Sequence, residues 1–205
     1  MKLSDIPTRL SQEMQDLSIQ LLPLATASWQ QLKKNTEIMQ EIAKDPLSEP
    51  VKAQAATAEF LSFFLHTCDR IASAAFNATV AEDAAATLRG AFMTGLVGAT
   101  IAAFMEELCE EETEEEQEAT QADLLYLYNT RAMQYGFLPL GSAQASHHPE
   151  PLFTLAGIRL AEALECADNA NIIIYAIEVI MTGLTTLQQQ LPLKDTISRL
   201  IATLH

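Results

Sequence analysis

The hydrophobic pattern is most informative over residues 51–79, VKAQAATAEFLSFFLHTCDRIASAAFNAT. If this stretch is a helix, its polar side chains fall on one arc about 100° wide, and apolar side chains cover the remaining arc of roughly 260°. The polar positions are Glu59, Ser62, His66, Asp69, Arg70, Ser73 and Asn77. We call the first six of these the polar seam. A helix with so much apolar surface contacts neighbours on several sides, so we expect it at the centre of the fold. The polar seam is then either a strip exposed to solvent or a buried functional line.

Helical spacing of apolar residues extends over most of the remaining chain. Residues 5–22 predict a first helix, and Pro23 should end or kink it because proline removes a helical hydrogen bond. Residues 119–135 and 152–204 also show helical spacing. Within the latter, the β-branched run at 172–181 would by itself indicate a buried strand. No second strand candidate exists to pair with it, so we expect a buried helix there.

These patterns predict an all-α, single-domain helical bundle of about six to eight helices over residues 1–205, with helix 51–79 at its centre. Capping-box spacings at Thr79–Glu82 and Thr113–Glu116 predict two of the helix starts. The one long loop is expected at residues 136–151, which are rich in Pro, Gly and His. Its adjacent histidines, 147 and 148, could bind a metal only with further ligands, and we favour a solvent-exposed pair.

The helix expected over about residues 80–111 carries two adjacent rows of small side chains. One row is Gly90, Thr94, Gly98 and Ala102, and the other is Ala91, Gly95, Ala99 and Ala103. Each glycine costs roughly 0.8–1 kcal/mol of helix propensity relative to alanine, so close packing is the expected compensation. We favour packing against helix 51–79, and the alternative is a subunit interface formed by the positions from Gly90 to Ala99.

The net charge of −15 is concentrated in one segment. Nine of the 27 acidic residues are glutamates within 106–118, a segment without Lys or Arg; the other 18 acidic and 12 basic residues leave the rest of the chain at −6. We expect a solvated acidic turn between two helices here, and the functional alternatives are a metal site or a basic partner. Without a basic patch, the composition gives no indication of nucleic-acid binding.

Several features point to the cytoplasm. Cys68, Cys109 and Cys166 lie far apart and cannot all pair, which is typical of reduced thiols. The N-terminal MKLSDIPTRL lacks the apolar region of a secretory signal. The longest uncharged run, residues 90–105, is shorter than the roughly 20 residues that span a bilayer, so we expect no membrane association.

The polar seam contains the residue types of a catalytic site but not a complete set. His66 has Asp69 and Arg70 at spacings that could orient an imidazole, but no Ser or Cys nucleophile shares its face, since Cys68 points about 180° from Glu59. The Glu-x-x-His motif of di-iron bundles does not occur in the sequence.

Two short motifs carry a resemblance to a known enzyme class. Glu106-Glu107-Leu108-Cys109-Glu110 is similar to the EExxE pattern of all-α nucleotide pyrophosphohydrolases of the MazG and dimeric dUTPase type. Glu165-Cys166-Ala167-Asp168, followed by an apolar run, resembles their ExxD helix. The resemblance implies Mg²⁺ held by Glu106, Glu107, Glu110, Glu165 and Asp168. The 54 residues between the motifs are more than this family's pattern leads us to expect, and the first motif lies in a glutamate-rich block.

Taken together, the sequence favours a non-enzymatic, cytoplasmic helical binding or adaptor protein without a cofactor. It would act through contacts with a protein partner, or with a second copy of itself, using the acidic segment and the small-residue rows. The alternative is a Mg²⁺-dependent enzyme of the pyrophosphohydrolase type, which requires the five carboxylates to meet in space.

Overall fold

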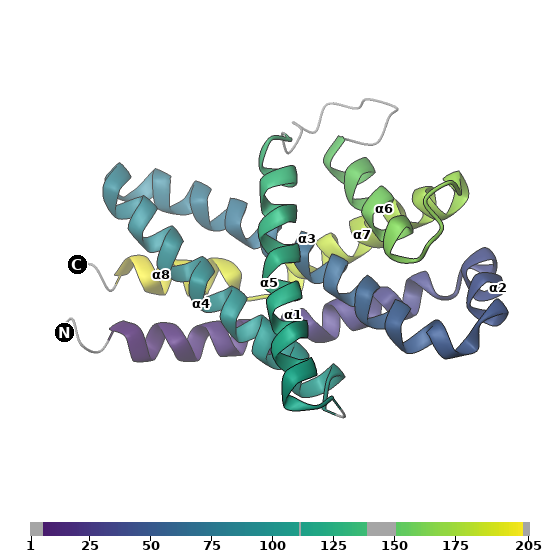
Figure 1. Ribbon diagram of the computed structural model, residues 1–205. Coiled ribbons are helices and arrows are strands. Elements are labelled where there is room, and N and C mark those ends of the chain that lie inside the picture. Colours follow the sequence, from purple (N-terminus) through teal and green to yellow (C-terminus); the bar gives the residue numbers. More distant parts are fainter. Residues whose placement is uncertain (1–5, 111, 139–150, 203–205) are drawn as a thin grey trace.

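A computed structural model describes residues 6–110, 112–138 and 151–202 (Figure 1). Eight α-helices and one short 3-10 helix make up the described residues, with no strand among them. They are α1 (Ile6–Leu32), α2 (Thr36–Lys44), η2 (Pro46–Ser48), α3 (Glu49–Thr79), α4 (Glu82–Leu108), α5 (Glu114–Gly136), α6 (Pro151–Ala163), α7 (Ala170–Gln190) and α8 (Leu193–Ala202). The predicted all-α class is confirmed.

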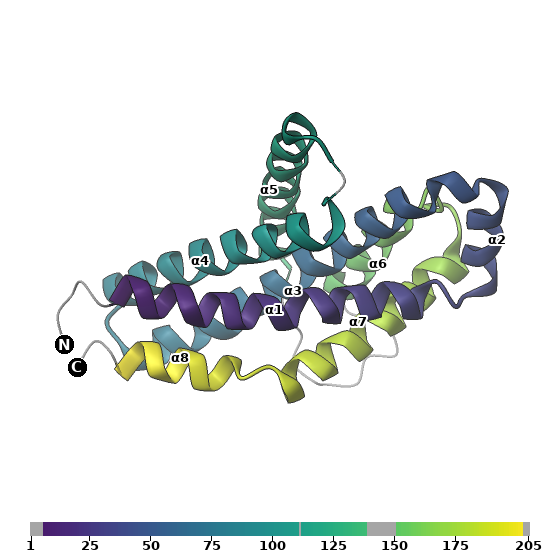
Figure 2. The ribbon, with the colours of Figure 1, turned by 90° about the horizontal axis from the view of Figure 1, so that it is seen from below.

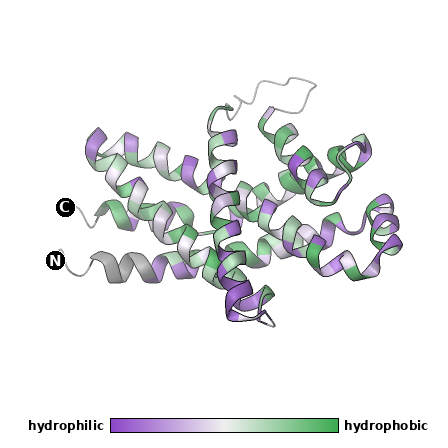
Figure 3. Cartoon of the chain, viewed as in Figure 1, coloured by the Kyte–Doolittle hydropathy of each residue, from purple (hydrophilic) through white to green (hydrophobic). Residues whose placement is uncertain are grey.

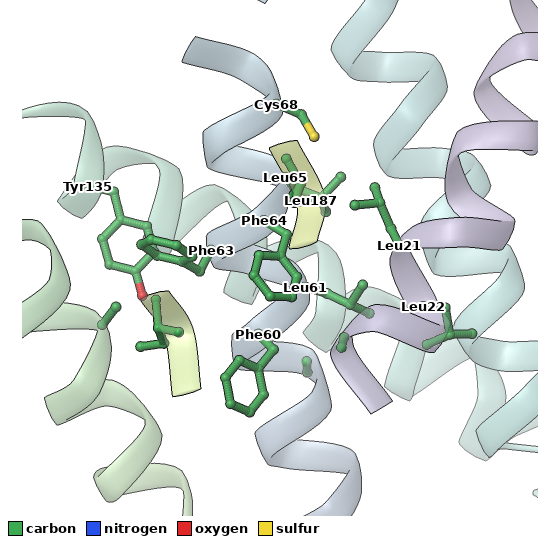
Figure 4. Packing of buried hydrophobic residues seen from close by; sticks show 14 of the residues in the cluster. Leu21, Leu22, Phe60, Leu61, Phe63, Phe64, Leu65, Cys68, Tyr135 and Leu187 are labelled. Atoms are coloured by element: carbon green, nitrogen blue, oxygen red, sulfur yellow. The ribbon is translucent and has the colours of Figure 1, made fainter. Parts of the chain in front are cut away.

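Helix α3 is the centre of the packing. Every residue from 56 to 69 is buried, and the helix contacts α1, α4, α5, α6, α7 and α8. Phe60, Phe63 and Phe64 lie at its middle; the ring of Phe64 is 6.2 Å from that of Phe60 and 6.1 Å from that of Phe63 (Figure 4). Burying aromatic rings of this size contributes a large share of the apolar free energy of folding.

The other helices are arranged around α3 in layers. α1 packs against both α3 and α4, and α7 and α8 lie on the other side of α1 from α4 (Figure 2). α6 packs on α7 and α3. In contrast, α5 runs crosswise over α3 and α4 and stands outside the layer that they form (Figures 1 and 2).

Pro23 was predicted to end or kink the first helix, and it does not end it. α1 continues through this proline as one helix from Ile6 to Leu32. Pro23 itself is exposed, whereas its neighbours Leu21, Leu22 and Ala25 are buried in the core. Burial of the flanking turns offsets the local cost of the proline, which is about 3 kcal/mol in a helix interior.

One of the two capping boxes forms. The backbone N–H of Thr113 donates to Glu116 Oε2 at 2.8 Å, and the N–H of Glu116 donates to Thr113 Oγ1 at 3.4 Å. At the other site the prediction was wrong, because Thr79 stays inside α3 and its hydroxyl donates to the carbonyl of Ala75 at 2.7 Å. Ala81 then takes the N-cap position of α4 without a side-chain hydrogen bond.

The β-branched run at 172–181 is helical, as predicted, and belongs to α7. Asn169 caps this helix by accepting hydrogen bonds from the N–H groups of Asn171 and Ile172. Most of the predicted loop at 136–151, including His147 and His148, lies outside the described residues.

Glycine allows α7 to approach the core closely at one position. A Cβ added at Gly183 would lie 2.6 Å from the Phe64 ring and 3.1 Å from Ser28 Oγ, whereas one added at Gly98 of α4 would meet nothing within 4 Å. We expect Gly183→Ala to destabilise the protein by about 1–3 kcal/mol, because buried groups must shift. Gly98→Ala should stabilise it by about 0.5–1 kcal/mol through helix propensity. Urea unfolding measures both, and equal effects of the two substitutions would contradict this packing.

Candidate functional site

The polar seam is buried where α5 and α4 cover α3. Glu59, Ser62, His66 and Asp69 are all buried, and Arg70 and Ser73 are partly exposed. These four side chains therefore form a buried line and not a strip exposed to solvent. Buried polar and charged groups are costly unless they are paired, so the partners of these side chains define what the seam does.

Glu59 is paired with Arg131 of α5. Arg131 Nε donates to Glu59 Oε2 at 2.8 Å, and a second guanidinium nitrogen, Nη2, donates to Oε1. Both side chains are largely buried, with 6% of Glu59 and 12% of Arg131 exposed. Arg131 also donates to Gln134 at 3.0 Å, which further satisfies the guanidinium. This ion pair connects the middle of α3 to the second half of α5.

Asp69 is paired with Arg89 of α4. The guanidinium donates from Nε at 2.7 Å and from Nη2 at 2.6 Å, one bond to each carboxylate oxygen. The hydrogen bond to Asp69 is the main cause that raises the pKa of Arg89. Tyr128 of α5 lies close by, and burial together with the charge of Asp69 raises its pKa to about 12. Asp69, the second carboxylate of the polar seam, therefore connects α3 to α4.

His66 and Arg70 hold the C-terminal end of α5. Arg70 Nε donates to His66 Nε2 at 2.8 Å, so the imidazole accepts and is neutral. Arg70 Nη2 donates to the backbone carbonyls of Tyr135, at 2.9 Å, and of Leu138. A cation on the last carbonyls of a helix satisfies unpaired acceptors and complements the helix dipole. The ring of Tyr135 lies 5.5 Å from His66 (ring centroids), and Figure 4 shows Tyr135 beside Phe63 of α3.

The polar seam is thus a set of contacts that fixes α4 and α5 on α3. Burial, with a smaller contribution from Arg70, lowers the pKa of His66 to about 4. Burial raises the pKa of the neighbouring Cys68 thiol to about 12, so this sulfur is not a nucleophile near neutral pH. We see no acid, base and nucleophile arranged for catalysis in the polar seam.

The five carboxylates of the magnesium alternative do not meet. Glu106, Glu107 and Glu110 lie at the end of α4, whereas Glu165 and Asp168 lie in the turn between α6 and α7, which Figure 1 shows at a separate place. Glu165 is paired instead with Lys52 at 3.4 Å. In the described part of the chain, no three His, Cys, Asp or Glu side chains come close enough to hold a metal ion.

The two small-residue rows of α4 have different surroundings. A Cβ added at Gly95 would lie 2.9 Å from Met14, so at this position the second row packs against α1, whereas we favoured packing against α3. The first row is exposed at Gly90, Thr94, Gly98 and Ala102. A Cβ added at Gly90 or Gly98 would meet nothing within 4 Å. Ala91 is exposed and Ala99 half-buried.

Two helices, Glu82–Leu108 and Ala170–Gln190, are long and apolar enough to cross a membrane by length and composition alone. Buried core helices of soluble proteins pass the same test, and 39% of the most apolar stretch of each helix is buried inside this fold.

An open groove lies where α5 crosses α3 and α4. Its volume is about 350 Å³. The residues that line it are Gln54, Ala55, Ala58, Phe104, Thr120, Asp123, Leu124, Tyr126 and Leu127. Ala58, Phe104 and Leu124 also line a second cavity, of about 20 Å³, which Thr100 and Tyr128 border as well. We call the larger space the α5 groove.

Sequence reasoning did not find the partners of the polar seam or the α5 groove. One signal was present: residues 124–128, LLYLY, are five consecutive apolar residues, more than one buried helix face can hold. In the structure, Tyr135 is the one residue of α5 that is buried. Tyr126 is 73% exposed and Phe137, just after the helix, is 86% exposed. Exposed apolar groups of this size are typical of binding surfaces.

Comparison with known proteins gives no match: no family model, no curated protein and no solved structure is similar to this chain.

The neutral state of His66 predicts a pH dependence of stability. Its pKa is about 4 in the folded protein and 6.5 as the reference value for the unfolded chain. Between these values the unfolded chain binds more protons, so the free energy of unfolding falls as pH falls from 6.5 to 4, by about 3 kcal/mol in total. We expect His66→Gln, which keeps an acceptor for Arg70, to lose about 2 kcal/mol less than the wild type between about pH 7 and pH 5. Urea unfolding at both pH values measures this, and equal losses in the two proteins would show that His66 does not stay neutral in the fold.

Proposed function

We propose that this protein is a non-enzymatic, cytoplasmic helical binding protein that acts through protein–protein contacts at the α5 groove. The observation that carries the proposal is the groove itself: an open, mainly apolar space of about 350 Å³ with an exposed tyrosine at its edge. An apolar groove between helices suits the apolar face of a partner helix.

The lining of the α5 groove supports this interpretation. Thr120, Asp123, Leu124 and Leu127 project from one face of α5, at spacings of three and four residues. Ala55 and Ala58 on α3 are small, which leaves room for side chains of a partner. Tyr126 offers a large aromatic surface with few rotatable bonds, and tyrosine is enriched among residues that dominate binding energy.

Two further observations support the remaining parts of the proposal. The titratable groups of the polar seam are engaged in holding helices together, which favours a binding role over catalysis. Cys68, Cys109 and Cys166 are free thiols and are buried, as is usual in a reducing compartment.

A second copy of the chain is the other candidate partner. Gly90 and Gly98 of the exposed row cost helix propensity, and no packing against the described residues compensates this cost. A helix from a second copy could approach that row closely.

We expect Tyr126→Ser to weaken binding of an apolar helix to the α5 groove by tenfold or more, since a tyrosine that a partner buries contributes roughly 2 kcal/mol. The probe is a synthetic amphipathic helix of about 18 residues with leucines on one face and glutamines on the other, which is long enough to be helical when bound. Its fluorescence anisotropy is measured with the wild type, with Tyr126→Ser and with the control Ile174→Ser, which removes another exposed apolar group, from α7. Equal affinity for all three proteins would contradict the proposal.

A further inference from the structure

Carboxylates border one end of the α5 groove. Gln54, which lines the groove, donates to the carbonyl of Leu108 at 2.8 Å, and Thr120, also in the lining, donates to Glu112 Oε2 at 3.0 Å. These two hydrogen bonds place the turn between α4 and α5 against the groove. Figure 3 shows hydrophilic residues gathered at this turn and over the first turns of α5.

The charged residues that line the groove and those of the adjoining acidic segment are all negative. Its lining includes Asp123 but no lysine or arginine. The adjoining residues 106–118 contain nine glutamates and no basic residue. A low-dielectric apolar wall beside charges of one sign strengthens their field and attracts ligands of the opposite sign.

The carboxylates beside the groove form no ion pair within the described part of the chain. Glu114 to Glu116 lie in the first turn of α5, where negative charge is favourable, and Glu116 completes the capping box. Glu107, by contrast, lies exposed in the last turn of α4, at the negative end of the helix dipole and one turn after Phe104 of the groove lining. Like Glu112 and Asp123, it forms no ion pair with any described residue.

A buried hydroxyl lies at the base of the same region. Thr100 of α4 is 1% exposed, and its Oγ1 has no hydrogen-bond partner among the described residues. It lines the cavity of about 20 Å³ that shares Ala58, Phe104 and Leu124 with the α5 groove. An unpaired buried hydroxyl is costly, and a polar atom that entered from the groove would satisfy it.

From these observations we infer that the partner of the α5 groove is a basic amphipathic helix. This inference rests on the proposed function and adds the chemistry of the partner. The apolar face of the partner lies against Leu124, Tyr126 and Leu127, and its Lys or Arg side chains lie beside Glu107, Glu112 and Asp123. Opposite charges on the two sides guide the encounter and select against acidic partners, including nucleic acids and anionic lipid surfaces.

The test uses three synthetic helices that share one leucine face and differ in the polar face, which carries lysine, glutamine or glutamate. We expect the lysine helix to bind about tenfold more tightly than the glutamine helix, and the glutamate helix to bind most weakly. The advantage of the lysine helix should decrease strongly in about 1 M NaCl, where the Debye length is only about 3 Å. A scrambled lysine peptide without an apolar face controls for unspecific attraction to an acidic protein.

Two protein variants with equal charge separate local from overall effects. Glu107→Gln/Glu112→Gln/Asp123→Asn removes three charges at the groove and keeps an acceptor for Thr120 at position 112. Glu82→Gln/Asp83→Asn/Glu178→Gln removes three exposed charges elsewhere. The groove variant should bind the lysine helix about tenfold more weakly than the wild type and the glutamine helix equally well. The control variant should resemble the wild type with both peptides.

The outcomes distinguish a failure of the inference about the basic partner from a failure of the proposed function. Three results would overturn the inference. Equal binding of the lysine and glutamine helices would show that positive charge is not recognised. Equal weakening of the lysine helix by both variants, or binding of the scrambled peptide as tight as that of the lysine helix, would show that the overall negative charge attracts the peptide and the groove does not. In each of these cases the proposed function survives only if Tyr126→Ser still weakens the glutamine helix. If none of the three helices binds, the proposed function fails as well.

Discussion

The buried ion pair between Glu59 and Arg131 is the interaction on which the candidate site depends. Tyr135 is the one fully buried residue of α5, and Leu124, Leu127 and Tyr128 are only partly buried against the core, so apolar burial contributes less to the attachment of α5 than it does for the other long helices. Its position relies on charged contacts to α3: the Glu59–Arg131 pair in the second half of the helix and Arg70 on the carbonyls at its end. Removal of one member of a buried pair is strongly destabilising because the remaining charge stays unpaired, so each charge requires the other.

This mode of attachment explains why a groove exists. A helix held mainly by apolar packing fully buries the large residues of one face. In α5, which crosses α3 and α4, the apolar residues are only partly buried, and polar contacts add to its attachment (Figure 1). Because α5 crosses the other two helices, an open space remains beside the crossing. Leu124, Tyr126 and Leu127 of α5 line this groove. The acidic α4–α5 turn is tied to the same place by Gln54 and Thr120, so the apolar and the charged parts of the surface adjoin one another.

The features that could be predicted from the sequence are those that depend on residues close together in the chain. The all-α class, the position of helix α3, the capping box at Thr113 and the helical state of the β-branched run follow from periodicity and local chemistry. Pro23 does not end its helix and Thr79 does not cap one, because local signals there compete with packing, which local patterns do not contain. The polar seam could be located, but its partner could not, since Arg131 is 72 residues away from Glu59 in the chain. Motif spacing likewise suggested a carboxylate site whose two halves the fold keeps apart.

A double-mutant cycle at Glu59 and Arg131, followed by amide hydrogen exchange, tests the central claim most directly. Glu59→Gln, Arg131→Met and the double variant should give a coupling free energy of about 2–3 kcal/mol. In Arg131→Met, exchange should accelerate over residues 114–136 while α1 and α7 keep their protection, because local unfolding is confined to the helix that loses its anchor. A coupling free energy near zero, or an acceleration spread evenly over all helices, would contradict the account that this ion pair holds α5 on α3.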